Sequence, residues 1–497
     1  MSRRIHFVWL IFLIAASLSA QDFGFGFGFD DEESSSLSMS IGNNLSVSIS
    51  GEVSASMLGY LDEFSEGSDH TQLGDIFAGS LGFAASTPIA EGVINLNLQP
   101  TETPVSIDEA YLRVYLGGFD ITAGLRKLTW GKADSFGPLD VINPLDTSIM
   151  FTEMADNTSL MSVKIARPLI HASYRFGQFS KIEGVFVPNF APYYIDTEGK
   201  WAPAQMEMLT NPAIPMSIPI PTQVDVNMTE TRPDTTMLDY AQVGLRFTTT
   251  IGPVDFGVQY YYGRLPQPAA KISLSSFSLD MASFPPGPVD VSADINVLYK
   301  YNPYHQIGFD YAQVLFGFNV RAELAANITE DSNGDDGSVY NSSIAWSLGF
   351  DRDVIWGINL NFQLNESIRL MHDKLGSRDI SLPSDFSISN LATIEEDMRN
   401  TISNSLDKVD IEGGSSLTST RLTMALSKKF LRDELEVRTA FVWGMEDKDC
   451  LIMPALIWTK DDLRFAFSGG FFAGDEEGQL GQYRKNSFLK LSLTYTF

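Results

Sequence analysis

The chain has 497 residues, of which 44% are hydrophobic and 12% aromatic, and its formal net charge is −28. A nucleic-acid partner is excluded on this balance, because phosphate binding requires a basic face. Cys450 is the only cysteine, so the chain cannot form an internal disulfide.

Residues 1–20 have the pattern of a secretory signal peptide. Arg3 and Arg4 form a basic start, an apolar run extends from Phe7 to Ala16, and the small residues of 17–20 form a cleavage site. The apolar run is shorter than the roughly 20 residues that a membrane-spanning helix needs. We therefore predict export and cleavage after residue 20, with an uncleaved anchor as the alternative.

Residues 21–43 are low in complexity. Phe23, Phe25, Phe27 and Phe29 alternate with glycine, and an acidic, serine-rich run follows. Glycine at every second position weakens a strand. We predict a periplasmic tail here; the alternative is a plug that places the phenylalanines in the mouth of a barrel.

Residues 44–497 consist largely of segments in which apolar and polar side chains alternate, as in 241–247. A period of two indicates strands. Short connections such as Gly117-Gly118 alternate with long ones, which is typical of a transmembrane antiparallel β-barrel with short periplasmic turns and long extracellular loops. We predict one barrel domain of about 18 strands, with 16 as the alternative. The expected strands are 44–61, 74–86, 91–99, 107–117, 119–130, 160–177, 179–188, 238–250, 253–264, 302–312, 314–328, 339–350, 354–365, 417–429, 434–445, 449–459, 462–473 and 484–497.

The long connections are expected on the extracellular side, at 131–159, 189–237, 265–291, 329–338, 366–416 and 474–483. Residues 189–237 are rich in proline and methionine, and because proline cannot donate a ladder hydrogen bond this loop is expected to be irregular. It either folds inward to narrow a pore or shields the outside. Ile394, Met398 and Ile402 have helical spacing and predict a short helix within 391–406.

The last strand ends the chain on an aromatic pair. Leu489, Leu491, Leu493, Tyr495 and Phe497 share one face, with polar residues between them. This ending resembles the C-terminal assembly signal of bacterial outer-membrane barrels, an aromatic residue, any residue, then Phe. The resemblance implies that Tyr495 and Phe497 are read by the barrel-assembly machinery, with periplasmic chaperones as earlier partners.

Basic residues recur on the face that the alternation turns inward, and fewer carboxylates accompany them. The inward carboxylates that we identify are Glu109, Asp255, Glu323 and Glu436, and Tyr111 lies opposite Arg126. A confined basic wall attracts anions, so we expect a pore with a mild anion preference; the alternative is a barrel stabilised by internal ion pairs. The expected pore-lining cations are Arg113, Arg126, Arg175, Arg246, Arg321, Arg421, Arg438, Arg464 and Lys490.

No arrangement for catalysis stands out in the sequence. The five histidines are scattered, so we predict no enzyme activity, no metal site and no cofactor. Asp331, Asn333 and Asp335 resemble the start of a calcium loop, but the glycine and the closing glutamate are missing. We interpret this stretch as a solvated acidic loop, with weak calcium binding as the alternative.

Residues 124–134 and 138–146 carry a family resemblance. A strand ends in Gly-x-Arg, Trp-Gly follows, and then an Asp-Val-Ile-Asn-Pro-x-Asp loop. This resembles a porin-like family of outer-membrane barrels akin to the alginate-export type, in an uncharacterised branch, which implies a barrel that passes or exports solutes without fixing the substrate. The motif residues are Trp130, Gly131, Asp140, Asn143, Pro144 and Asp146. From chemistry alone, the Asn-Pro pair and the last aspartate favour turns, and the tryptophan is expected at the outer membrane interface.

Together these features predict a channel in the outer membrane of a Gram-negative type of envelope, in contact with lipid, for passive passage of small polar or anionic solutes. One alternative is uptake of hydrophobic compounds by a barrel plugged by a loop or the tail. Another is a structural or adhesin barrel whose loops bind a surface partner.

Overall fold

The computed structural model describes residues 37–41, 44–62, 71–72, 77–100, 103–157, 159–196, 199–203, 222–280, 289–371, 395–396, 399–400, 403 and 416–497. The expected signal peptide, the Phe–Gly stretch and the proline- and methionine-rich part of the loop at 204–221 lie outside these residues.

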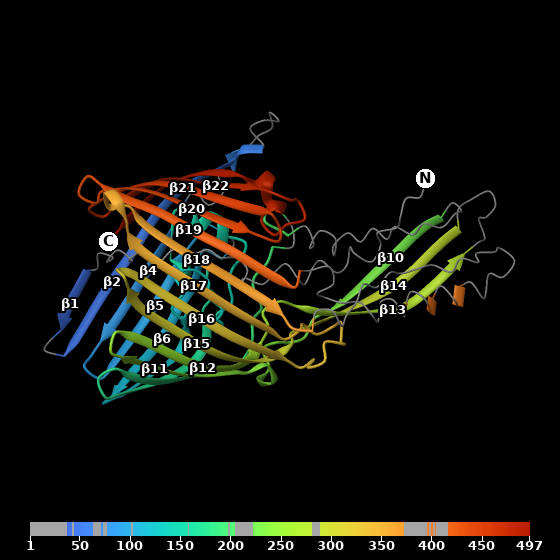
Figure 1. The fold of residues 1–497 in the computed structure, drawn as a ribbon, viewed down its shortest axis with the longest axis horizontal. Coiled ribbons are helices and arrows are strands. Elements are labelled where there is room, and N and C mark those ends of the chain that lie inside the picture. Colours follow the sequence, from blue (N-terminus) through green and yellow to red (C-terminus); the bar gives the residue numbers. More distant parts are fainter. Residues whose placement is uncertain are drawn as a thin grey trace.

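Eighteen of the 20 strands of the main sheet close into an antiparallel barrel, and the other two pair with β2 (Figure 1). The ring closes where β2 pairs with β23, from Glu52 opposite Thr496 to Tyr60 opposite Phe488. All the expected strands are present. In ring order they are β2 (Leu45–Tyr60), β4 (Phe77–Ser86), β5 (Ala90–Leu98), β6 (Val105–Leu116), β7 (Phe119–Arg126), β8 (Arg167–Phe176), β9 (Ser180–Val187), β11 (Gln242–Ile251), β12 (Val254–Arg264), β15 (Pro303–Leu315), β16 (Phe318–Thr329), β17 (Ser343–Asp353), β18 (Asn359–Arg369), β19 (Thr418–Phe430), β20 (Leu435–Gly444), β21 (Asp449–Lys460), β22 (Leu463–Ala473) and β23 (Phe488–Thr496).

The alternation of the sequence separates the two faces of the wall. Leu245, Phe247 and Val258 are exposed on the outside, whereas Arg246 and Gln259 are buried inside. An apolar outer face and a polar interior are what a strand barrel needs in lipid. The short turns lie at the end of the barrel that holds Phe497, which places them in the periplasm and the long loops outside.

The start of the barrel differs from the expected tail, because β1 (Leu37–Ile41) forms a hairpin with β2. The first residues of β2 extend past the last residue of β23, and they pair with β1 from Leu37 opposite Ile49 to Ile41 opposite Leu45. An open sheet edge invites pairing, so β1 covers the edge that the chain end leaves. A two-residue strand, β3 (Thr71–Gln72), pairs with the other end of β2.

Two of the expected loops contain strands. β10 (Thr222–Thr231) pairs in parallel with β14 (Val289–Lys300), which pairs antiparallel with β13 (Ala269–Asp280), and this sheet projects beyond the mouth of the barrel (Figure 1). The expectation of irregular chain was wrong for 222–231. The neighbouring prolines, Pro221 and Pro233, flank this segment without interrupting its ladder.

The helices are short. α3 (Met150–Met154) and the 3-10 turns η1 (Leu160–Ser162), η2 (Leu238–Tyr240), η3 (Ile355–Gly357) and η6 (Gly481–Asn486) lie in connections between strands. The described residues of 391–406 are helical, as the spacing predicted. Within the described part of the chain, no helix has the length and hydropathy of a membrane span.

Candidate functional site in the barrel lumen

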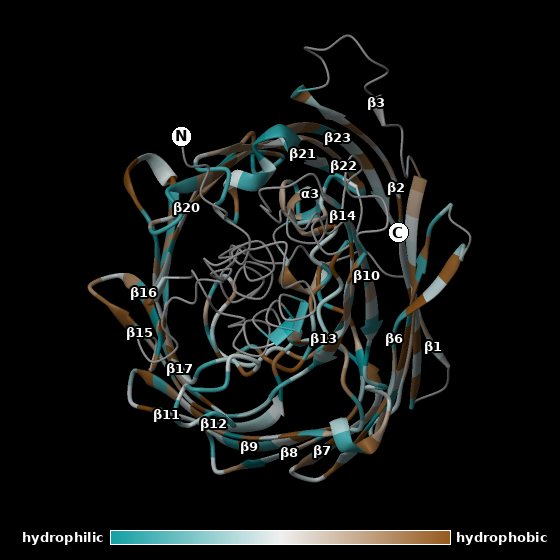
Figure 2. Cartoon of the chain, turned by 90° about the vertical axis from the view of Figure 1, so that its right-hand side faces the viewer, coloured by the Kyte–Doolittle hydropathy of each residue, from teal (hydrophilic) through white to brown (hydrophobic). Residues whose placement is uncertain are grey.

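The connection between β7 and β8 folds into the barrel, and we call residues 127–166 the inward loop. Figure 2 shows α3, which belongs to it, inside the ring of strands. Asn143 holds the two ends of this loop together. Its carbonyl oxygen accepts the Leu128 amide at 2.7 Å, and its amide donates to the carbonyls of Arg126 at 3.1 Å and Ile165 at 2.9 Å. The Asn-Pro motif is therefore the clasp of the loop.

A buried ion pair stabilises the same base. Lys164 Nζ lies 2.5 Å from an Asp140 carboxylate oxygen, and both side chains are buried. Lys164 also donates to the Leu128 carbonyl at 3.1 Å and to Thr129 Oγ1 at 2.7 Å. Asp146 accepts hydrogen bonds from the amide and the hydroxyl of Ser148, as expected of a turn former.

The tip of the inward loop binds the opposite wall through Glu323 on β16. The Glu323 carboxylate accepts the amides of Lys132, Ala133 at 2.7 Å and Leu139 at 3.4 Å. A Cβ on Gly131 or on Gly137 would lie 2.3 Å from a Glu323 oxygen, so only glycine lets the loop backbone approach this carboxylate. This contact gives the motif glycine a physical role.

Other side chains of that wall hold the loop next to Glu323. Asp134 pairs with Arg321 and accepts the Asn361 amide at 3.1 Å. Burial raises the pKa of the Asp134 carboxyl above its usual value, although Arg321 and Asn361 act against this. Wall glutamines bind loop carbonyls, Gln259 at Leu139 (3.0 Å), Gln306 at Pro138 (2.9 Å) and Gln363 at Phe136 (3.3 Å).

A second wall holds the loop at Asp156. Lys490 Nζ lies 3.1 Å from its carboxylate, and the Ser492 hydroxyl donates to the same carboxylate at 2.7 Å. Arg464 donates to the Asp156 backbone carbonyl, and Arg438 donates to the Ala155 carbonyl at 3.3 Å. The inward loop therefore crosses the lumen from β7 to β16 and from there to β20–β23.

The connection after β9 also crosses the lumen. We call residues 188–203 the crossing segment. Trp201 packs 5.3 Å from the Phe151 ring of the inward loop and 5.8 Å from the Phe472 ring of β22, measured between ring centroids. Tyr483 donates to the Trp201 carbonyl at 3.4 Å. Of the two expectations for the loop 189–237, the inward fold is correct for these residues.

Trp130 is not at the outer interface, so that expectation was wrong. Its side chain is 3% exposed and belongs to an internal apolar cluster with Val185 and Tyr261. A Cβ on Gly244 would lie 2.5 Å from the indole ring. The inward-facing glycine of β11 thus makes room for the tryptophan inside the barrel.

Most of the predicted lumen cations have a carboxylate beside them. Arg113 lies 3.4 Å from Glu91 and Arg246 lies 2.6 Å from Asp310. Three of them differ: the Arg126 guanidinium lies 5.0 Å from the Tyr111 ring centroid, and Arg438 and Arg464 donate to the backbone carbonyls of Ala155 and Asp156. The remaining pairs are Arg175 with Asp120, Arg321 with Asp351, Arg421 with Asp447 and Asp449, and Lys490 with Glu153.

Sequence reasoning therefore undercounted the carboxylates. The missed carboxylates on the strands are Glu91, Glu183 and Asp310, and assigning the inward face of every strand would have identified them. The carboxylates of the inward loop were also missed, because a loop has no periodicity that marks its inward side chains. The wall and the inward loop therefore carry more carboxylates than the sequence analysis assigned to the lumen. Arg175 is also 71% exposed beside a periplasmic turn rather than deep in the lumen.

The strands away from the inward loop leave the lumen more accessible. The inward faces of β2 and β4 carry Glu52 and otherwise mostly small side chains, and those of β5 and β6 carry half-buried polar groups that include Glu91, Glu109, Tyr111 and Arg113. By contrast, Gln259, Gln306, Asn361 and Gln363 are buried under the loop. The small inward residues are Ser46, Ser48, Ser50, Ser54 and Ser56 on β2 and Ala78, Ser80, Gly82, Ala84 and Ser86 on β4.

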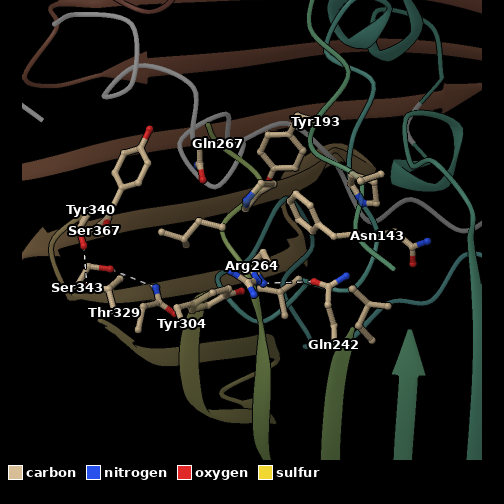
Figure 3. A pocket seen from close by; sticks show the side chains of 18 of the residues that line it. Asn143, Tyr193, Gln242, Arg264, Gln267, Tyr304, Thr329, Tyr340, Ser343 and Ser367 are labelled. Atoms are coloured by element: carbon tan, nitrogen blue, oxygen red, sulfur yellow. Dashed lines mark hydrogen bonds between the residues drawn. The ribbon is translucent and has the colours of Figure 1, made fainter. Parts of the chain in front are cut away.

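A cavity of about 110 Å³ lies at the loop end of the barrel, between the inward loop, the crossing segment and the ends of the strands from β8 to β18. Figure 3 shows Arg264, Gln267 and Tyr304 among its side chains. Three arginines and no aspartate or glutamate are among the described residues that line it. We call it the mouth pocket.

The acidic stretch after β16 folds on itself. The Asp331 carboxylate accepts the amides of Asn333 at 3.2 Å, Gly334 at 2.9 Å and Asp336 at 2.8 Å. No group of three or more His, Cys, Asp or Glu side chains in the described ranges is arranged to hold a metal ion.

Comparison with known proteins bears only on the fold. No family model and no curated sequence matches the chain. Among solved structures it is similar to Salmonella typhi OmpF, at 7% identity over 93% of this chain and 100% of that one, with a TM-score of 0.40. It is also similar to Pseudomonas aeruginosa OpdG, at 8% identity over 91% of this chain and 98% of that one, with a TM-score of 0.46. A third similar structure is Wzi of Escherichia coli, described as a carbohydrate-binding barrel involved in capsule assembly, at 10% identity over 90% of this chain and 84% of that one, with a TM-score of 0.42.

Proposed function

We propose that the protein is a passive outer-membrane channel that conducts small polar solutes, anionic ones included, past the inward loop. The observation that carries this proposal is the asymmetry of the lumen. Polar side chains on β2 and β4–β6 remain half-buried or exposed, whereas those on β12 and β15–β19 are buried beneath the loop. A solute that passes the loop would therefore move along β2 and β4–β6.

The chemistry of that side favours polar solutes. Arg113 and Glu91 form a half-buried pair, and Tyr111 lies beside Arg126. Donors and acceptors that alternate along a wall can replace the hydration of a polar solute. The rival function, uptake of hydrophobic compounds, rests on the Phe–Gly tail and on 204–221, which lie outside the described residues.

The projecting sheet supports a second candidate function, binding of a surface partner. β10 and β14 carry exposed polar groups, and Asn227 on β10 donates to Asp294 on β14 at 3.1 Å. Such a sheet reaches past the barrel mouth without contributing to the lumen (Figure 1). A variant that lacks residues 222–231 and 269–300 would lose partner binding and keep conductance under this second function.

We also infer a cleaved signal peptide, recognition of Tyr495 and Phe497 by the barrel-assembly machinery, and kinship to the porin-like family akin to the alginate-export type. The kinship rests on the motif residues that hold the inward loop in place. Asn143 joins the two ends of the loop, Asp140 pairs with Lys164 at its base, and Gly131 lets the loop backbone approach Glu323. The family proposal thus predicts an inward loop of the same construction in its other members.

The test is single-channel conductance in planar bilayers, with a pair of variants on β2. Ser54→Trp places an indole in the lumen, whereas Val53→Trp places it on the lipid face, where Val53 is exposed. We expect a stable conductance that the Ser54 variant lowers and the Val53 variant leaves unchanged. A barrel that never conducts would refute the channel, and equal conductance of both variants would refute a passage along β2.

A further inference from the structure

The mouth pocket differs from the rest of the lumen in its charge. Arg167 Nη2 donates to Asn189 Oδ1 at 2.5 Å, and Arg264 donates to the backbone carbonyls of Tyr301 at 3.1 Å and Asp239 at 2.9 Å. All of these acceptors are neutral. Neither arginine forms an ion pair with any residue that the structure describes, in contrast to Arg246 and Arg421 deeper in the barrel.

The pocket is also lined by largely buried side chains whose polar atoms have no hydrogen-bond partner among the described residues. Gln267 is 7% exposed and Tyr304 is 3% exposed, and neither side chain has a hydrogen bond to another described residue. Arg167 Nε is likewise buried without a partner. Buried polar groups are normally hydrogen-bonded, so these atoms are available to a bound molecule.

We propose that the mouth pocket is a binding site for a small hydroxylated organic acid, whose carboxylate is held by Arg167 and Arg264 and whose hydroxyl groups are held by Gln267 and Tyr304. A guanidinium binds a carboxylate through parallel, charge-assisted hydrogen bonds. Two guanidinium groups without carboxylate neighbours favour an anion, and the neutral groups beside them favour hydroxyls over a bare inorganic ion. The cavity volume limits the ligand to a small solute.

The position of the site connects it with transport. The pocket is formed by the extracellular ends of β8, β11, β12 and β15–β18, and the inward loop contributes Ile142 and Asn143 to its lining. An anion bound there is held at the extracellular end of the barrel, next to Asn143 at the base of the inward loop. This deepens the proposed channel function, and it rests on that function for what happens to the ligand after binding.

The test uses gluconate as the probe and sorbitol as its neutral counterpart. Binding is measured by isothermal titration calorimetry on the folded protein in detergent. Arg167→Gln and Arg264→Gln remove one charge each, Gln267→Leu removes only the amide, and Arg175→Gln is the matched control outside the pocket. We expect gluconate binding by the unmodified protein and no heat from sorbitol. Each arginine change should weaken binding by about tenfold or more, Gln267→Leu should weaken it by a few-fold, and the control should bind normally.

The outcomes separate this site from the channel. Absence of gluconate binding to the unmodified protein, or equal affinity in the arginine variants, would overturn the pocket and leave a conducting barrel intact. Equal binding of sorbitol would overturn the role of charge. Gluconate binding by a protein that never conducts in bilayers would support the pocket and refute the channel. Heat-modified mobility on gels confirms the fold of each variant, and the Gln267 variant, whose charges are unchanged, keeps the test valid if an arginine variant does not fold.

Discussion

Gly51 and Phe497 exchange two backbone hydrogen bonds across the seam of the barrel, the Gly51 amide donating at 2.9 Å and the Phe497 amide donating back at 2.8 Å. A Cβ at position 51 would lie 2.7 Å from the Phe497 ring and 2.8 Å from the Ser80 carbonyl. The last residue of the chain is therefore also the last pair between β2 and β23. Closure of the ring removes the open edges of the sheet. In lipid this is essential, because unpaired backbone N–H and C=O groups find no water to bond there.

This seam predicts an assembly defect in two different variants. Deletion of Phe497 removes both hydrogen bonds, and Gly51→Ala forces a methyl group against the ring. Both should lower the amount of heat-modifiable barrel in outer-membrane fractions, while the molecules that do insert keep their conductance. Gly92→Ala is the matched control, because nothing lies within 4 Å of a Cβ there. Normal barrel levels in both seam variants would show that the pair is dispensable.

The hydrogen bonds between Glu323 and the tip of the inward loop predict a change in conductance when they are removed. Glu323→Ala leaves three loop amides without their acceptor, and hydrogen bonds to a charged group contribute about 1.5–3 kcal/mol each. The tip of the inward loop should detach from β16, so the single-channel conductance should rise and fluctuate more. Glu477→Ala, on an exposed extracellular loop, is the control. An unchanged current in the Glu323 variant would mean that the other loop contacts suffice.

The buried pair of Lys164 and Asp140 predicts non-additive stability. Removal of one partner leaves a buried charge alone, which typically costs about 3–5 kcal/mol, whereas replacement of both by apolar residues is far less costly. Lys164→Met should therefore lower the urea midpoint of the detergent-solubilised barrel more than Lys164→Met combined with Asp140→Leu. Equal midpoints for the two proteins would contradict a buried ion pair whose charges depend on each other.

The strands were predictable because each one separates lipid from lumen, and that separation imposes a period of two on the sequence, as in 241–247. The projecting sheet was not, because β10 lies among prolines and its partner β14 is more than 60 residues away. The clasp at Asn143 was visible only as a turn signal. Its partners Leu128 and Ile165 lie on both sides of it and carry no pattern that marks them.

The position of Trp130 inside the barrel and the carboxylates of the inward loop were not predicted, for a related reason. A loop that folds into a lumen is neither a surface loop nor a strand, so its tryptophan, Asp134 and Asp156 find their neighbours only in three dimensions. An inward reading of β15 would have assigned Asp310 to the lumen beforehand, because it shares the face of Gln306.

The wall of the passage predicts how charge selectivity responds to substitution. Arg113 is balanced by Glu91 at 3.4 Å, and Glu109 accepts the Lys127 amide one residue from Arg126. With cations and carboxylates close together, the unmodified channel should be only weakly selective. Arg113→Gln combined with Arg126→Gln removes two positive charges and leaves Glu91 and Glu109 in place, so the reversal potential in a salt gradient should shift toward cations.

Salt provides the control for that experiment. The Debye length is about 10 Å at 0.1 M and about 3 Å at 1 M, so a shift that originates in fixed wall charges should be large at low salt and small at high salt. Arg175→Gln, whose side chain is largely in solvent beside the periplasmic turn, should shift the potential much less. Glutamine is polar but uncharged, and because it is shorter than arginine it leaves the lumen slightly wider. A change in conductance without a change in reversal potential would therefore be an effect of width and not of charge. A double variant with the selectivity of the unmodified protein would place the passage away from β5–β7.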